Sequence, residues 1–102
     1  MNDYKKIQRD FSFLTLYGYN FEHIEHHYIM PSVVFSNTSQ RIQIGMNYED
    51  GDIFILYYEN LETFRWKNLL DDIHFSSNKY EEQVEKAKDI LIKFLTNKTK
   101  SI

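Results

Sequence analysis

Residues 41–62 read RIQIGMNYEDGDIFILYYENLE, and this stretch decides the fold. From the second position of 41–48 onward, alternate residues are large and apolar, which is typical of a half-buried antiparallel strand. Residues 53–59 are apolar on both faces and predict a strand that is central or covered on both sides. Between the two, Asp50 and Gly51 suit a tight turn, because this pair accepts positive φ angles. The stretch therefore predicts a β-hairpin.

The sequence on either side of this hairpin predicts two long helices, one toward each end of the chain. Over 3–17, large apolar residues recur at steps of three and four, which places them on one helical face. Gly18 follows and can end the helix in a left-handed conformation. Residues 79–95 carry a second apolar stripe, with acids near the start and lysines further on, as the helix dipole favours.

Three shorter segments complete the pattern. Residues 21–30 fit a helical face or an alternating strand, and their position between a glycine and Pro31 favours an edge strand. Residues 33–36 are mostly β-branched or aromatic and predict another strand. Over 66–73, large apolar residues at helical spacing predict a short helix.

This order of elements predicts an α+β fold. We expect an antiparallel sheet of three to four strands, with the N- and C-terminal helices packed on one face, because both apolar stripes need a surface to cover. A chain of 102 residues is expected to form a single domain over 1–102. A hydrophobic fraction of 42% and an aromatic fraction of 17% are typical of a folded protein rather than a disordered one.

The composition also excludes several kinds of chemistry. The chain has no cysteine, which excludes disulfides, thiolate catalysis and zinc sites built on cysteine. The N-terminal residues are polar and no apolar segment of a signal peptide follows them. The apolar runs are too short to cross a bilayer. We therefore expect a cytoplasmic protein that does not associate with a membrane.

Negative charge is concentrated in one part of the chain. From Glu49 to Glu62 there are five acids and no base, a charge of −5, whereas the whole chain carries −3. Turns are commonly polar, and acids on strands protect sheet edges from aggregation, so each acid alone has an ordinary explanation. Their clustering without an intervening base instead favours a surface for a cationic partner.

Aromatic residues accompany these acids, and tyrosine and tryptophan are frequent anchors of protein interfaces. A negative field would also steer a basic partner toward them. The predicted partner-binding residues are Glu49, Asp50, Asp52, Tyr57, Glu59, Glu62 and Trp66.

Three histidines offer an alternative function. His23 and His27 are four residues apart, which would place both on one face of a helix, and His26 lies between them. The neighbouring residues match neither zinc-protease motif, and a metal would need further ligands. A solvent-exposed strand face is the simpler interpretation, and a small-ligand or metal-binding domain that uses these histidines, with His23 and His27 as the candidate ligands, is the alternative.

Other catalytic and nucleic-acid signals are weak. Asp71 and Asp72 lie near His74, but adjacent acids on a helix point in different directions, so we expect them to face solvent. Phosphate loops and nucleophile motifs are absent from the sequence. We expect no catalysis and no cofactor. The pI near 5.7 argues against direct binding of nucleic acid, in spite of a lysine-rich C-terminal end.

Three segments carry a resemblance to a known class of protein. They are Phe11-Ser12-Phe13-Leu14 with Gly18-Tyr19, Pro31-Ser32-Val33-Val34-Phe35, and the strand Ile42-Gln43-Ile44-Gly45-Met46-Asn47-Tyr48, followed by the amphipathic C-terminal helix. This layout resembles small bacterial immunity proteins, which protect against polymorphic or contact-dependent growth inhibition toxins. The resemblance implies an inhibitor that binds a cognate toxin domain, often a nuclease. An acidic face would then stand in for the phosphates of nucleic acid.

Overall fold

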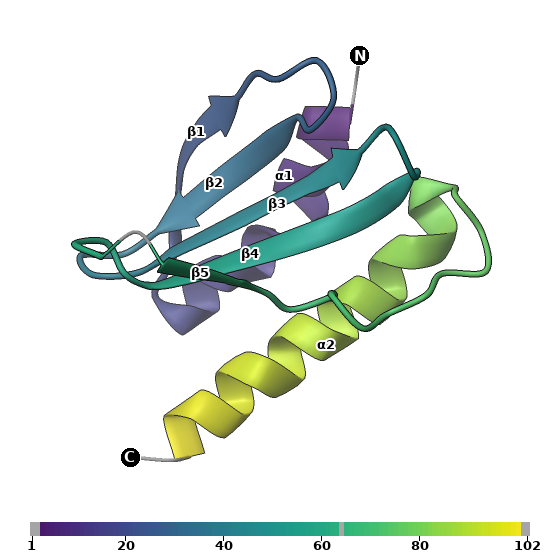
Figure 1. Ribbon diagram of the computed structural model, residues 1–102. Helices are drawn as coiled ribbons and strands as arrows, with labels where there is room; N and C mark the ends of the chain where they lie inside the picture. Colours follow the sequence, from purple (N-terminus) through teal and green to yellow (C-terminus); the bar gives the residue numbers. More distant parts are fainter. Residues whose placement is uncertain (1–2, 64, 101–102) are drawn as a thin grey trace.

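The computed structural model describes residues 3–63 and 65–100 (Figure 1). The elements are α1 (Asp3–Asp10), the 3-10 helix η1 (Ser12–Tyr17), β1 (Asn20–Glu25), β2 (Ser32–Ser36), β3 (Arg41–Asn47), β4 (Asp52–Asn60), β5 (Arg65–Asn68) and α2 (Tyr80–Lys100). The strands form one antiparallel sheet in the order β1-β2-β3-β4-β5. The α+β class is confirmed. The prediction of three to four strands is wrong, because the described residues form five.

The additional strand is β5, which occupies the start of the segment predicted as a helix over 66–73. Trp66 pairs with Tyr58 of β4, and Asn68 pairs with Leu56. The Asn68 side chain then accepts the N–H of Leu70 at 3.0 Å, which begins a turn. Pairing with β4 and this turn outweigh the helical spacing, because tertiary contacts override a local preference.

The boundaries of three predicted elements also change. The helix predicted over 3–17 is α-helical only as far as Asp10 and continues as η1. There the hydroxyl of Ser12 donates to the carbonyl of Arg9 at 2.8 Å, a local bond that competes with the α-helical ladder. The strand predicted over 21–30 ends at Glu25, and α2 continues five residues beyond the predicted end at residue 95.

Both glycine predictions that rest on backbone conformation are confirmed. Gly18 follows η1 with a φ of 90°. The N–H groups of Gly18 and Tyr19 donate to the carbonyls of Thr15 and Leu14, which satisfies the carbonyls at the helix end. Gly51 in the turn between β3 and β4 has a φ of 78°.

The core lies between one face of the sheet and the helices. Across the strands, Val33, Ile44 and Ile55 are aligned in register and are fully buried. The helices add their apolar stripes to the same core, with Phe11 and Leu91 completely enclosed. Figure 1 shows the strands in front of α1, so the front of the sheet is the opposite face. In the described residues no helix crosses that face, which we call the open face.

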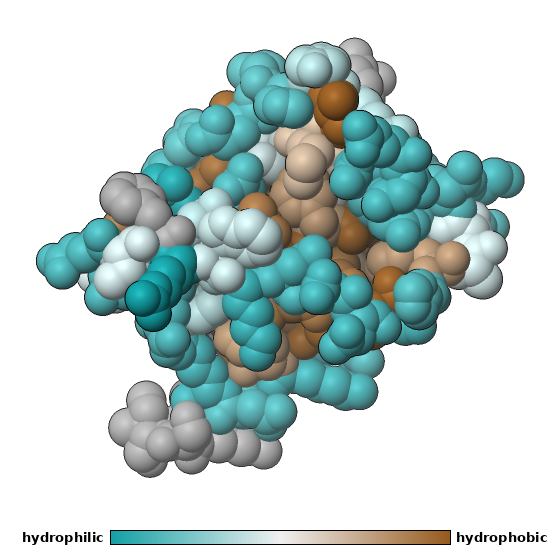
Figure 2. All heavy atoms as spheres, in the orientation of Figure 1, coloured by the Kyte–Doolittle hydropathy of each residue, from teal (hydrophilic) through white to brown (hydrophobic). Residues whose placement is uncertain are grey.

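The open face is not uniformly polar. Phe54 of β4 lies beside Gly45 of β3 in the sheet register and is only 5% exposed. Figure 2 shows apolar atoms between hydrophilic ones on this side of the molecule. No helix among the described residues is long and apolar enough to span a membrane.

A polar contact joins the two helices. The Tyr80 hydroxyl at the start of α2 donates to Asp10 at 2.8 Å, and Arg9 donates to the same carboxylate at 3.0 Å. Partial burial alone would raise the pKa of Asp10, but the hydrogen bonds from Arg9 and Tyr80 outweigh it and hold this pKa below its ordinary value of 3.8.

We expect Asp10→Asn to lower the free energy of unfolding by about 1 kcal/mol near neutral pH, because it weakens a charge-assisted bond. A carboxyl with a lowered folded pKa stabilises the protein above its unfolded pKa, and this stabilisation disappears as the pH falls through the folded value. The difference between variant and parent should therefore be smaller at about pH 2.5 than near neutral pH. Urea titrations at both pH values measure it. The same pH response in Asp89→Asn, a change at an exposed acid of α2, would contradict the explanation.

Candidate functional site

The acids that are consecutive in the sequence lie at opposite ends of β4. Glu49, Asp50 and Asp52 lie at the turn that precedes or begins the strand, whereas Glu59 and Glu62 lie at its far end. A strand of nine residues spans about 25 Å. The charge run therefore forms two separate groups rather than one continuous surface.

The group at the turn contributes to a groove on the open face. Its volume is about 400 Å³. The lining residues, which define the acidic groove, are Met30, Asn47, Asp50, Asp52, Ile53, Phe54, Leu56, Trp66, Asn68, Leu70, Asp71, Ile73, His74 and Phe75. Three of them are acids and none is a lysine or arginine, so this described part of the surface carries −3 with His74 neutral.

The acidic groove combines charge with an apolar floor. Phe54 and Leu70 are buried, and Ile73 is partly exposed. Trp66 is 59% exposed and lies at the β5 side. A cationic side chain can therefore place its charged end at the carboxylates and its methylene stem on apolar atoms.

Hydrogen bonds fix the carboxylates at the turn. Asp50 Oδ1 accepts the N–H of Asp52 at 3.0 Å. Asp52 Oδ1 in turn accepts a bond from the Gln83 side chain at 3.2 Å. The neighbouring Gly51 N–H donates to the Asn47 carbonyl at 2.7 Å, which closes the turn. These bonds hold Asp50 and Asp52 in place as fixed negative charges, an arrangement suited to binding.

Gln83 of α2 is the central support of this region, and the sequence interpretation missed it. It is only 1% exposed. Its Oε1 accepts the Ile53 N–H at 2.7 Å, and its Nε2 donates to the carbonyls of Gly51 and Ser77, each at 2.8 Å. The signal was present in the sequence, because Gln83 lies three residues after Tyr80 and directly before Val84 on the apolar stripe of the helix. A polar residue on a buried stripe needs partners.

The far end of β4 has a different character. There a groove of about 440 Å³ separates β5 from the C-terminal half of α2. The lining residues, which define the basic groove, are Tyr57, Glu59, Arg65, Trp66, Lys67, Phe94, Asn97 and Lys98. Three cations and one acid give it a charge of +2.

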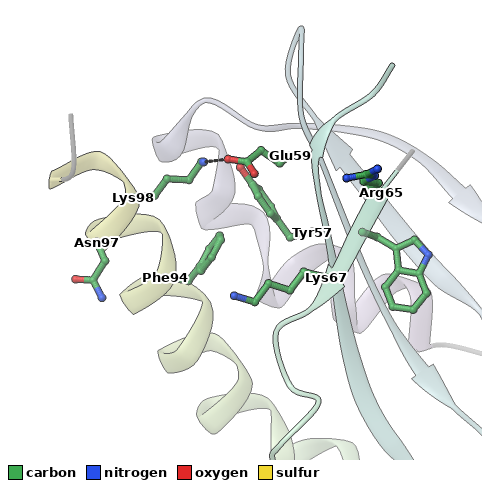
Figure 3. Close-up of a pocket in the computed structure, with 8 residues that line it drawn as sticks. Tyr57, Glu59, Arg65, Lys67, Phe94, Asn97 and Lys98 are labelled. Carbon is green, nitrogen blue, oxygen red and sulfur yellow. Dashed lines mark hydrogen bonds and ion pairs between the residues drawn. The ribbon is translucent and has the colours of Figure 1, made fainter. Parts of the chain in front are cut away.

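Tyr57 and Glu59, which we predicted as partner-binding residues of an acidic surface, line the basic groove and not the acidic groove. Figure 3 shows Lys98 and Phe94 extending from α2 toward Glu59 and Tyr57, and Lys67 extending from β5 toward Phe94. The Tyr57 and Phe94 rings meet edge to face at 4.9 Å, and Tyr57 is 3% exposed. Lys98 Nζ lies 3.0 Å from Glu59 Oε1, and this bond is the largest cause of a raised pKa of Lys98.

The remaining predicted acids can now be placed. Glu62 is exposed in the turn after β4, where its N–H donates to the Asn60 side chain. Asp71, which we expected to face solvent on a helix, lines the acidic groove together with His74. The structure therefore brings together Asp50, Asp52 and Trp66 of the predicted set and adds Asp71.

The histidine cluster that the alternative function requires does not form among the described residues. His23 Nε2 lies 2.6 Å from Glu25, and the His26 ring meets Tyr4 edge to face at 5.2 Å. His27 Nδ1 accepts the N–H groups of Ile29 and Met30, which shapes the loop after β1. Within residues 3–63 and 65–100, no group of three potential ligands could hold a metal. Each histidine has a separate local role because the segment is a strand followed by a loop and not a helix.

Comparison with protein-family models, with curated proteins and with solved structures gave no match. The two grooves, of opposite charge on the two sides of β5, are therefore the basis for a functional proposal.

Proposed function

We propose that this protein is a non-catalytic inhibitor that binds a basic protein domain through the acidic groove, in the manner of the bacterial immunity proteins that its sequence resembles. The cognate partner would be a cytosolic toxin domain, and a nuclease is the favoured class. The observation that carries the proposal is the groove itself, in which three carboxylates and no lysine or arginine surround an apolar floor.

The chemistry of the acidic groove supports a protein partner. Fixed carboxylates attract lysine and arginine side chains and raise the rate of encounter with a basic surface. Trp66 offers a large exposed ring of the kind that anchors interfaces. The same negative charge repels nucleic-acid phosphates. In this proposal the groove covers the surface with which a nuclease would otherwise bind the phosphates of its substrate.

The first test is growth protection. The gene next to the one for this chain is to be searched for a large reading frame, and the C-terminal domain that it encodes is to be expressed with and without this protein. We expect the domain alone to arrest growth and co-expression to restore growth. The two proteins should also be purified together as a complex. Toxicity that continues although both proteins are present would contradict the proposal.

The second test assigns binding to the acidic groove. We expect Asp50→Asn with Asp71→Asn to slow association with that domain by about tenfold at low salt, because two steering charges are lost. Asparagine keeps a side-chain oxygen at residue 50 that can accept the N–H of Asp52, as the turn needs. Stopped-flow kinetics at two salt concentrations measure the effect.

The matched control removes two charges elsewhere. Glu62→Gln with Asp89→Asn changes the net charge equally, but both residues lie outside the acidic groove. We expect association to slow by less than about twofold in this control, since the field of a charge falls with its distance from the contact surface. Equal slowing in the two double variants would show that net charge, and not the groove, controls association.

A further inference from the structure

The strand β5 has an outer edge that no other described strand covers. It is the last strand in the sheet order. The N–H of Leu69 donates to the Ile55 carbonyl at 2.8 Å, and Lys67 pairs with Tyr57. Because bonding alternates along an antiparallel strand, the N–H and C=O of Trp66 point away from β4. This edge therefore offers backbone groups to an added strand.

The side chains of β5 alternate between two environments. Trp66 pairs with Tyr58 on the open face, whereas Lys67 lies on the side of α2, where its Nζ is 5.9 Å from the centre of the Phe94 ring. Arg65 also lines the basic groove. A strand added along this edge would therefore place every second side chain beside cations.

The contact between Lys98 and Glu59 shows what the basic groove accommodates. Glu59 places a carboxylate within it, 3.0 Å from Lys98 Nζ. Arg65 and Lys67 leave the groove with an excess of positive charge over this single acid. A second copy of β5 would bring the same cations opposite one another, and like charges across a strand pair are destabilising. The charge favours an acidic occupant.

We propose that the β5 edge and the basic groove bind an extended acidic segment of a partner protein, which adds to the sheet as a sixth strand. Main-chain hydrogen bonds to Trp66 provide pairing, and alternate carboxylates of the segment face Arg65, Lys67 and Lys98. The other side chains of the segment, which point to the open face, pack beside the Trp66 ring. This surface is separate from the carboxylates of the acidic groove, so the proposal does not depend on the proposed inhibitor function.

The test uses a synthetic peptide of about seven residues in which glutamate alternates with threonine. Trp66 is the single tryptophan of the chain, so its fluorescence reports binding directly. We expect the alternating peptide to bind at least about tenfold more tightly than an isomer with its glutamates in one block, because only the alternating order matches the period of a strand. If both isomers bind equally well, binding depends only on net charge and not on strand pairing, and the proposal is overturned.

Hydrogen exchange tests strand addition separately from charge. We expect the bound peptide to slow exchange of the Trp66 amide by at least about tenfold, since this N–H would enter the sheet ladder. Binding without such protection would contradict the sixth strand.

Charge variants complete the experiment. We expect Arg65→Glu with Lys67→Glu to weaken peptide binding by at least about tenfold. Lys5→Glu with Lys86→Glu makes the same change in net charge at exposed positions outside the basic groove and should leave the affinity within about twofold. An equal loss in both double variants would exclude the basic groove as the site.

Discussion

Gly45→Ala is expected to lower the free energy of unfolding by about 3 kcal/mol or more, because β3 has no space for a methyl group at this position. An added Cβ would lie 2.2 Å from the carbonyl oxygen of Pro31 and 2.8 Å from both Phe54 Cζ and Ser32 Cβ. The Pro31 carbonyl also accepts the N–H of Met46 at 3.2 Å, so it cannot withdraw without weakening that bond. Urea unfolding followed by circular dichroism measures the loss.

Two comparisons separate this contact from other effects of removing a glycine. Gly18→Ala adds a methyl where nothing lies within 4 Å, but the φ of +90° is unfavourable, and it should cost only about 1–2 kcal/mol. Adding Phe54→Leu to Gly45→Ala should not restore stability, because the closest contact is with backbone. Recovery in that double variant, or a smaller loss at Gly45 than at Gly18, would contradict the explanation.

The hairpin could be predicted because its signals are local. Alternation over 41–48 and the apolar run over 53–59 each extend across enough residues to determine a strand, and Gly51 marks the turn between them. Strand β5 could not be predicted in this way. It has four residues, its pairing depends on β4, and its large side chains continue at helical spacing into the next turn.

The candidate site was only partly visible in the sequence for a related reason. A run of acids is continuous along the chain, but an extended strand separates its ends by about 25 Å. Conversely, Asp50 and Asp71 are distant in the sequence and line one groove. Their proximity follows from the pairing of β5 with β4, which no local pattern predicts.

The position of β5 explains how one small sheet can present two surfaces of opposite charge. Its alternate side chains point to different sides, and Trp66 lines both grooves. On the open face the turn between β3 and β4 supplies carboxylates, and on the other side α2 supplies Lys98. A basic partner and an acidic segment would therefore contact different sides of the same strand and share only the Trp66 ring.

Gln83→Leu is expected to lower the free energy of unfolding by about 3 kcal/mol, because leucine can fill the space but cannot replace the hydrogen bonds. The Ile53 N–H and the carbonyls of Gly51 and Ser77 would each lose the partner that Gln83 provides. Gln8→Leu, the same substitution on α1, should change stability by less than about 0.5 kcal/mol. Urea unfolding of both variants gives the comparison.

The loss of these hydrogen bonds should also affect the acidic groove in the folded protein, because Gln83 joins α2 to two segments near it. Its side chain bonds Asp52, the turn at Gly51 and the loop at Ser77. In Gln83→Leu we expect the Ile53 amide to exchange hydrogen at least about tenfold faster under conditions in which amides of the central strands remain protected. A uniform increase across the sheet would instead show global destabilisation, and an unchanged Ile53 amide would exclude Gln83 as the support of the turn. A local increase in the exchange rate would show that the Gln83 side chain holds the turn in place. That turn carries the carboxylates that the proposed partner would contact.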